Sequence, residues 1–219
     1  MKNIILIAPP AAGKGVQSKI LKETFNLLHL STGELLKEEV EKKTELGKEI
    51  KEFLKQGILV KDEIVIELVR KKLDNSLNKN GYILDGFPRT LTQAELYDKM
   101  SQERNCLPNY VFFLNIPKET ALKRILGRLN CLKCGSIFNE ESDHLTEKDL
   151  CPNCQGKIIK RSDDQEESFN KRYDDYLEKT KPVIQYYQNK GILYIIDAKK
   201  SITEISKQIK EILAKDLKI

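Results

Sequence analysis

The sequence has no tryptophan, only two methionines and two histidines, and no long run of apolar residues. Its longest apolar stretch, Ile4 to Ala12, is nine residues long and contains two prolines, whereas a membrane-spanning helix needs about 20 residues. The same stretch is too short and too rich in proline to be the apolar segment of a secretory leader. We therefore expect a cytoplasmic protein with no membrane partner.

A long block of like charge is also missing. The 219 residues carry 38 Lys and Arg against 33 Asp and Glu, which gives a formal net charge of +5. The 8 Tyr and 7 Phe do not alternate with basic residues, as the stacking surfaces of nucleic-acid-binding proteins do. The sequence therefore argues against a nucleic-acid partner and favours small phosphorylated molecules. Its hydrophobic content of 40% excludes overall disorder and suits one domain with a small insert.

Short apolar runs alternate with helical patterns along the chain. Five runs predict buried parallel strands: Ile4–Ala8, Leu27–Leu30, Tyr82–Leu84, Tyr110–Ile116 and Ile192–Ile196. Helices are expected after the first strand, from the capping box at Ser31 and Glu34, from Thr44 to a stop at Gly57, from Asp62 through Leu77, and over 118–128, 164–189 and 202–217. Pro182 predicts a kink in the long helix. This alternation predicts an α/β fold with a parallel sheet.

The loop after the first predicted strand has the composition of a phosphate-binding turn. It reads Ala8-Pro9-Pro10-Ala11-Ala12-Gly13-Lys14-Gly15. Backbone N–H groups at such a turn bind phosphate with help from the helix N-terminus, and a lysine there contacts the β- and γ-phosphates. The spacing is similar to a P-loop, but Ala8 replaces its first glycine and Gly15 its Ser/Thr. On this segment alone, an ordinary turn with an incidental lysine remains an alternative.

Two further motifs follow predicted strands, where open parallel sheets bind their ligands. They are Asp85-Gly86-Phe87-Pro88-Arg89 and Ser31-Thr32-Gly33. Arg89 is suited to hold a phosphate through two parallel hydrogen bonds, and the Asp85 carboxylate suits the water shell of Mg²⁺. Each motif alone is also an ordinary turn or cap. Three such motifs at strand ends favour a nucleotide site.

Four of the five cysteines form two Cys-x-x-Cys pairs, Cys131 with Cys134 and Cys151 with Cys154, separated by sixteen residues. They lie in a stretch without periodicity, about 129–160, which predicts a small inserted unit. The spacing is typical of a closed tetrahedral zinc site, in which the metal is structural. A redox or disulfide role is the alternative. Cys106, His29 and His144 are not expected to be ligands.

These motifs together resemble the adenylate kinase family over nearly the whole chain. The resemblance is carried by Gly13-Lys14-Gly15, Ser31-Thr32-Gly33 and the segments 59–63, 85–93, 124–128 and 161–172. It implies reversible transfer of the γ-phosphoryl group of MgATP to AMP, giving two ADP, and Thr90 and Gln93 favour AMP as the acceptor. It also implies a P-loop NTPase-type five-stranded parallel sheet flanked by helices. The core would comprise 1–30, 61–127 and 166–219, with a helical AMP-binding insert at 31–60 and a zinc-binding lid at 128–165.

The resemblance also implies the site residues. The catalytic cations are Lys14, Arg89, Arg124, Arg128, Arg161 and Arg172. The ATP site comprises Ala11, Ala12, Gly13, Lys14, Gly15, Val16, Arg124, Arg128, Ile137, Phe138 and Lys200. The AMP site comprises Thr32, Lys37, Ile58, Leu59, Val60, Gly86, Phe87, Pro88, Arg89, Gln93, Arg161 and Arg172. Asp85 would orient the water shell of Mg²⁺, and Cys131, Cys134, Cys151 and Cys154 would bind a structural Zn²⁺.

The expected chemistry needs cations rather than a general base, because the phosphate of AMP is already the nucleophile. Arg124 and Arg128 are expected one turn apart on a single helix, facing the donor phosphates. Asp163 and Asp164 resemble a hinge pair that orients the arginines as the lid closes. The family's members of this length are mostly monomers, which implies a monomer here.

Four positions depart from the family pattern: Ala8, Ala11, Val16 and Lys37. Ala11 is expected where a positive φ is wanted, at a cost of about 1–2 kcal/mol. Val16 lacks a hydroxyl for the donor α-phosphate, and Lys37 offers a point charge in place of an arginine fork. These changes predict weaker affinity for ATP, not another reaction. Two alternatives stay open: a kinase with another donor such as GTP, and a catalytically weak nucleotide-binding protein. A zinc-ribbon nucleic-acid module is disfavoured because the cysteines interrupt a complete kinase pattern.

Overall fold

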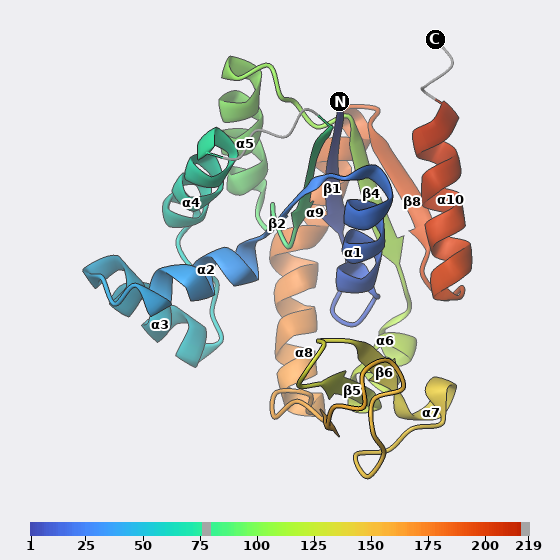
Figure 1. The fold of residues 1–219 in the computed structure, drawn as a ribbon. Helices are drawn as coiled ribbons and strands as arrows, with labels where there is room; N and C mark the ends of the chain where they lie inside the picture. The colour runs from blue at the N-terminus through green and yellow to red at the C-terminus, as the bar shows by residue number, and fades with distance from the viewer. Residues whose placement is uncertain (76–79, 216–219) are drawn as a thin grey trace.

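A parallel sheet of five strands forms the centre of the computed structural model, which describes residues 1–75 and 80–215 (Figure 1). The strand order is β2-β3-β1-β4-β8, and every neighbouring pair is parallel. The strands are β1 (Lys2–Ile7), β2 (Leu28–Ser31), β3 (Gly81–Asp85), β4 (Tyr110–Asn115) and β8 (Leu193–Asp197). All five predicted strands are therefore confirmed, with bounds that differ by one or two residues.

Helices cover both faces of this sheet (Figure 1). They are α1 (Lys14–Phe25), α2 (Thr32–Glu41), α3 (Glu45–Gln56), α4 (Asp62–Asn75), α5 (Leu91–Glu103), α6 (Lys118–Leu126), α8 (Glu166–Asp175), α9 (Lys181–Asn189) and α10 (Ile202–Lys215). No helix was expected at α5. The predicted positions of Leu77 and Leu217 lie outside the described residues.

The predicted caps begin and end the helices of the insert. Ser31 Oγ accepts a hydrogen bond from the Glu34 N–H at 3.4 Å, and Thr44 Oγ1 accepts one from the Gly47 N–H at 3.0 Å. Gly57 ends α3 in the left-handed region, with φ 65°. Because these signals are local, the sequence predicted α2 and α3 well.

The predicted helix over 118–128 is wrong at its end. Helix α6 stops at Leu126, and Arg128 begins β5 (Arg128–Cys131). Gly127 caps the helix, and a side chain on it would lie 3.0 Å from Nδ2 of Asn139. Asn139 ends the partner strand β6, and it pairs with Arg128. Strand pairing thus takes Arg128 out of the helix, so Arg124 and Arg128 do not share a helical face.

The predicted long helix is interrupted just before its proline. A π-helical turn, η1 (Tyr176–Thr180), joins α8 to α9. Pro182 has no N–H to give, and its ring crowds the carbonyl four residues earlier. The irregularity at this proline is thus a widened π-helical turn, while the expected kink stays a prediction.

A small second sheet forms the lid below the core in Figure 1. Its order is β6-β5-β7, with β6 (Ile137–Asn139) and β7 (Ile158–Ile159) antiparallel to β5, and the short α7 (Glu140–Asp143) follows β6. The paired helices α2 and α3 project to the left of the core in Figure 1. Among the described residues, none of the helices has the length and apolar character required to cross a bilayer.

Candidate nucleotide site and metal centre

The turn between β1 and α1 leaves its backbone open for a phosphate. Gly13 precedes the helix with φ 86°, and a methyl group placed on it would meet no atom within 4 Å. Ala11 also has a positive φ of 61°, as expected from the sequence. No side chain caps the N-terminus of α1, and Lys14 is the first residue of this helix. Such an N-terminus is suited to bind an anion.

Asp85, at the carboxyl end of β3, contacts three polar side chains from two elements, α1 and β2. It forms an ion pair with Lys14 of α1 and accepts a hydrogen bond from Ser18 Oγ at 2.9 Å. His29 Nε2 of β2 lies 3.3 Å from Asp85 Oδ2. Burial, together with the nearby Arg89 and Arg172, lowers the pKa of Lys14. The carboxylate therefore holds Lys14 where the loop would present a phosphate.

Gly86 is the point on which the strand-end motifs converge. Its carbonyl accepts hydrogen bonds from Thr32 Oγ1 at 2.9 Å and from Arg89 Nε at 2.8 Å. A methyl group placed on Gly86 would lie 3.1 Å from Arg89 Nη2, 3.1 Å from Thr32 Oγ1 and 3.6 Å from Lys14 Nζ. Two cations and a hydroxyl from three separate elements thus surround one bare stretch of backbone.

The loop that carries Arg89 is held by polar side chains around it. Gln93 Oε1 accepts a hydrogen bond from the Arg89 N–H at 2.7 Å. Asp62, at the start of α4, accepts one from Gln93 Nε2 at 2.7 Å and another from Thr90 Oγ1 at 2.8 Å. Gln93 thus bonds through both its amide oxygen and its amide nitrogen, and it links the backbone of Arg89 to Asp62.

The remaining arginines line the approach to the lid. Arg128 forms a two-point ion pair with Asp164, whose side chain is 1% exposed. Arg161 Nη2 donates to Asn130 Oδ1 at 2.9 Å, and Arg172 Nη1 lies 3.5 Å from Asp163 Oδ2. Burial, and next the neighbouring Arg128 guanidinium, lower the pKa of Arg161. These groups form an electropositive cluster, and the two acidic residues of the expected hinge pair each hold one arginine.

Arg124 lies apart from that cluster, against the loop after β8. Its Nη1 donates to the Ala198 carbonyl at 2.8 Å and its Nη2 to the Lys199 carbonyl at 3.3 Å. This contact brings Arg124 close to the segment that carries Lys200. Arg124 is thus anchored on the side of the site next to β8.

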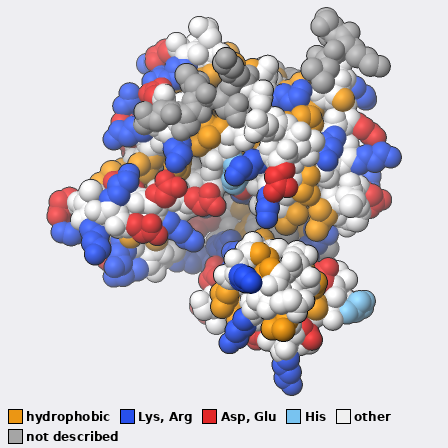
Figure 2. All heavy atoms as spheres, viewed as in Figure 1, with side chains coloured by type: hydrophobic (Ala, Val, Ile, Leu, Met, Phe, Trp, Pro, Cys, Tyr) orange, Lys and Arg blue, Asp and Glu red, His pale blue; other side chains and the backbone are white. Residues whose placement is uncertain are grey.

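The other expected site residues are placed by the insert and the lid. Lys37 and Ile58 are exposed, Leu59 is half-buried, and Val60, Phe87 and Pro88 are buried. Val16 is half-buried in the first turn of α1. Ile137 is 39% exposed, while Phe138 packs against the lid core. Figure 2 shows a recess between the lid and the rest of the molecule, with Lys and Arg side chains along it.

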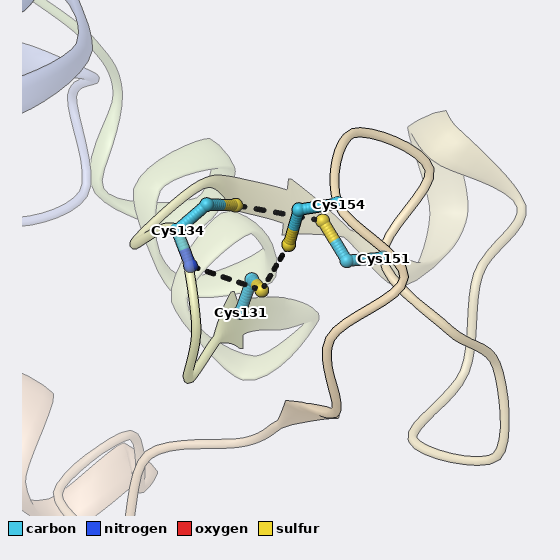
Figure 3. Close-up of side chains that lie close together, drawn as sticks. All are labelled: Cys131, Cys134, Cys151 and Cys154. Carbon is cyan, nitrogen blue, oxygen red and sulfur yellow. Dashed lines mark hydrogen bonds between the residues drawn. The ribbon is translucent and has the colours of Figure 1, made fainter.

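The four paired cysteines form one cluster in the lid (Figure 3). Their sulfur atoms lie within 4.8 Å of one another, with Cys131 to Cys154 at 3.4 Å and Cys134 to Cys151 at 3.6 Å. Four thiolates around a tetrahedral Zn²⁺, at about 2.3 Å each, stand about 3.8 Å apart. The donor set and its spacing therefore fit a closed tetrahedral metal.

Two backbone features fit the same reading. The N–H groups of Lys133 and Cys134 point at Cys131 Sγ at 3.4 and 3.5 Å, which stabilises a thiolate and lowers the pKa of Cys131. A methyl group on Gly156 would lie 3.1 Å from Cys131 Sγ and 3.3 Å from Cys154 Sγ. The chain thus keeps the space beside the sulfur atoms clear with a glycine.

Three contributors to the site were missed from the sequence. Ser18 and His29 reach Asp85 because of the phase of α1 and the register of β2 on β3, where His29 faces Ile83. Asp62 was expected only as the start of a helix, but it also holds Gln93. The spacing of Ser18 four residues after Lys14, on one helical face, is the one signal that pointed to such a contact.

Comparison with known proteins agrees with this arrangement. A model of the family described as adenylate kinase matches residues 6–192. The chain is 43% identical to an adenylate kinase of Archaeoglobus fulgidus over 97% of this chain and 98% of that protein. It is 40% identical to one of Caldicellulosiruptor bescii, over 94% and 96% of the two chains, and 37% identical to one of Clostridium tetani, over 96% and 98%.

Proposed function

The chain belongs to the adenylate kinase family and catalyses the reversible transfer of the γ-phosphoryl group of ATP to AMP, and on that premise we propose how its residues divide this work. The observation that carries the proposal is the convergence of Lys14, Thr32 and Arg89 on the Gly86 backbone. In phosphoryl transfer the protein mainly positions the reactants and stabilises charge. A cluster of fixed cations at one strand edge meets that need.

The donor ATP lies along the β1–α1 turn. The N–H groups of residues 11–16 hold its phosphates, and Lys14 leaves the Asp85 carboxylate to contact the β- and γ-phosphates. Arg128 neutralises the donor phosphates from the lid, and Arg124 does so from α6. Ile137 and Phe138 of the lid and Lys200, which follows the segment that Arg124 contacts, border the adenine.

The acceptor AMP lies between the insert, residues 31–60, and the loop over 86–89. Arg89 and Arg172 hold its phosphate, with Lys37 as an additional charge and Arg161 closing from the lid, residues 128–165. Residues 58–60, Thr32 and Gln93 border its base. An oxygen of the AMP phosphate forms a bond to the γ-phosphorus, and the bond from that phosphorus to the β–γ bridging oxygen breaks. Two molecules of ADP result, and no proton has to be removed from the nucleophile.

Two metal ions complete the proposal. Asp85 is suited to Mg²⁺ because its carboxylate ends β3 beside Lys14 and is acceptor-only; bound with ATP, the ion neutralises charge on the phosphates. The four cysteines fit Zn²⁺, which would order the lid without taking part in the reaction. Because one chain supplies every residue named, a monomer suffices. Four thiols kept as a metal site favour the reducing cytoplasm.

The test is ADP formation from MgATP and AMP, with GTP as an alternative donor and CMP and UMP as alternative acceptors. We expect turnover with ATP and AMP, and we expect Arg89→Lys to lower kcat/KM for AMP about 10²-fold because the arginine fork is lost. Arg70→Lys is the matched control, since Arg70 pairs with Glu67 on the exposed side of α4. A folded, metal-loaded protein that forms no ADP from ATP and AMP would overturn the proposal.

A further inference from the structure

The π-helical turn η1 presents a threonine hydroxyl to the loop of Arg89. In a regular helix a threonine hydroxyl commonly bonds to the carbonyl four residues earlier in its own helix. Thr180 instead donates from Oγ1 to the Arg89 carbonyl at 3.0 Å, across 91 residues of sequence. Single π-helical turns within α-helices occur frequently at functional sites. The irregular turn and the long-range hydrogen bond coincide at this one residue.

Both backbone polar groups of Arg89 are thereby bonded to side chains of other elements. Its N–H donates to Gln93 Oε1 of α5 at 2.7 Å, and its carbonyl accepts from Thr180. The carbonyl lies outside the hydrogen bonds of α5, in which Ala94 N–H bonds to the Thr90 carbonyl. Two side chains thus hold the backbone of Arg89, and the guanidinium of the same residue donates to the Gly86 carbonyl.

We propose that Thr180 is a positioning residue for Arg89, and that the π-turn exists to bring its hydroxyl to the Arg89 carbonyl. Thr180 acts through Arg89 and does not contact substrate. The inference rests on the role given to Arg89 above. It adds a residue from the α8–α9 helix, which also carries Arg172 and runs to the lid, to the set that orients the acceptor phosphate.

The arrangement also explains why the turn and the proline occur together. Pro182 prevents the regular hydrogen bond to the carbonyl of residue 178. The bond that closes the widened turn runs from the Lys181 N–H to the Tyr176 carbonyl. The Tyr176 carbonyl thus bonds to the N–H five residues on instead of to that of Thr180, and the Thr180 hydroxyl donates to the Arg89 carbonyl.

Thr180→Val keeps the shape of the side chain and removes the hydroxyl. We expect kcat/KM for AMP to fall about three- to tenfold, the range of one neutral hydrogen bond, with KM for ATP unchanged. Thr180→Ser should restore kcat/KM, because it returns the hydroxyl. Thr24→Val is the matched control: Thr24 is exposed near the end of α1, away from the carboxyl ends of the strands, and its activity should equal that of the original chain.

A double-mutant cycle separates positioning from a general effect on the fold. If Thr180 acts through Arg89, Thr180→Val should cost much less in the Arg89→Lys background than in the original chain. Additive losses in the cycle, or equal losses for AMP and ATP, would overturn the inference. Unchanged kinetics of Thr180→Val in an active enzyme would do the same. A parent protein that lacks AMP-dependent ADP formation would instead refute the proposed function.

Discussion

The core and the lid of this protein are stabilised by different means. The core has two apolar clusters, with side chains such as Ile4, Ile5 and Ile83 fully buried. The buried cluster of the lid consists of four residues, Leu129, Cys131, Cys151 and Ile158, and two of them are cysteines of the proposed zinc site. A unit of fewer than about 40 residues cannot bury enough apolar surface to fold alone. The proposed metal coordination would take the place of a larger core.

The difference between the two regions shows how a small unit can be rigid in itself and still move separately from the core. The core depends on sheet pairing and side-chain packing that extend over the whole chain. In the lid, residues 128–165, order is proposed to depend on metal coordination at one point, and an ion pair between Arg128 and Asp164 joins the two ends of the lid. Such a lid would be suited to move as one body, because the proposed metal site lies wholly within it. Substituting a proposed metal ligand tests this difference between the lid and the core directly.

The largest effect is expected from Cys151→Ala. Cys151 is fully buried in the lid cluster, and zinc bound to four thiolates contributes about 10–16 kcal/mol to folding in small metal-binding units. We expect the variant to lose its zinc and the fold of the lid while the core stays folded. Activity should fall at least about 10²-fold, since Arg128 and Arg161 lose their positions. Zinc analysis, limited proteolysis and the ADP assay would measure these effects.

Cys106→Ala is the matched control for that variant. Cys106 is also buried, but it follows α5 in the core and lies outside the metal cluster. The Cys106→Ala variant should retain one zinc per chain and near-normal activity. If Cys151→Ala kept its zinc and an intact lid, the proposed coordination would be wrong. If both variants lost the core, the lid and core would not be separable in the way described.

A smaller effect is expected where the lid joins the core. Asp164→Asn leaves the guanidinium of Arg128 half-buried without its counter-charge, and breaking a buried pair in this way costs about 3–5 kcal/mol. Asp163→Asn is the matched control, because Asp163 is 58% exposed and lies 3.5 Å from Arg172; its cost should stay below about 1 kcal/mol. Urea unfolding would give both values. Equal stability of the two variants would show that the pair between Arg128 and Asp164 does not stabilise the base of the lid.

The core was more predictable from the sequence than the lid, for a physical reason. Apolar runs and caps such as Ser31, Thr44 and Gly57 are local signals, and the strands and helices that they predict are present. The lid strands are ordered by the cysteine cluster and are only two to four residues long. No alternation of apolar and polar residues in the sequence therefore predicted them. The end of α6 before Arg128 was missed because it depends on the pairing of Arg128 with Asn139, a contact that exists only in the folded lid.

The site followed the same division. Motifs at strand ends predicted that Lys14, Thr32 and Arg89 would meet, because parallel strands end at one edge of the sheet. The contacts of His29 and Thr180 depend on strand register and on an irregular turn. No spacing in the sequence encodes either of them. Residues proposed to touch the substrate thus had a signal in the sequence, whereas residues proposed to hold them in place had none.

The smallest effect is expected in the phosphate-binding turn, where two neighbouring alanines should respond in opposite directions. Ala11 has φ 61°, a conformation that costs an alanine about 1–2 kcal/mol and a glycine nothing. Ala12 is 1% exposed and packs in the core, with no positive φ. Ala11→Gly should therefore raise the free energy of unfolding by up to about 1 kcal/mol, since the relief of strain exceeds the added freedom of the unfolded chain.

Ala12→Gly should lower the free energy of unfolding by about 1 kcal/mol, because it removes a buried methyl group and adds freedom to the unfolded chain. Urea unfolding of the two variants compares them directly, and KM for ATP measures the effect on the donor site. Relief of strain in Ala11→Gly should leave KM for ATP equal or lower, because the turn reaches its phosphate-binding shape at less cost. Destabilisation by both substitutions would mean that the methyl group of Ala11, which packs beside the same core cluster, contributes more than its backbone strain costs.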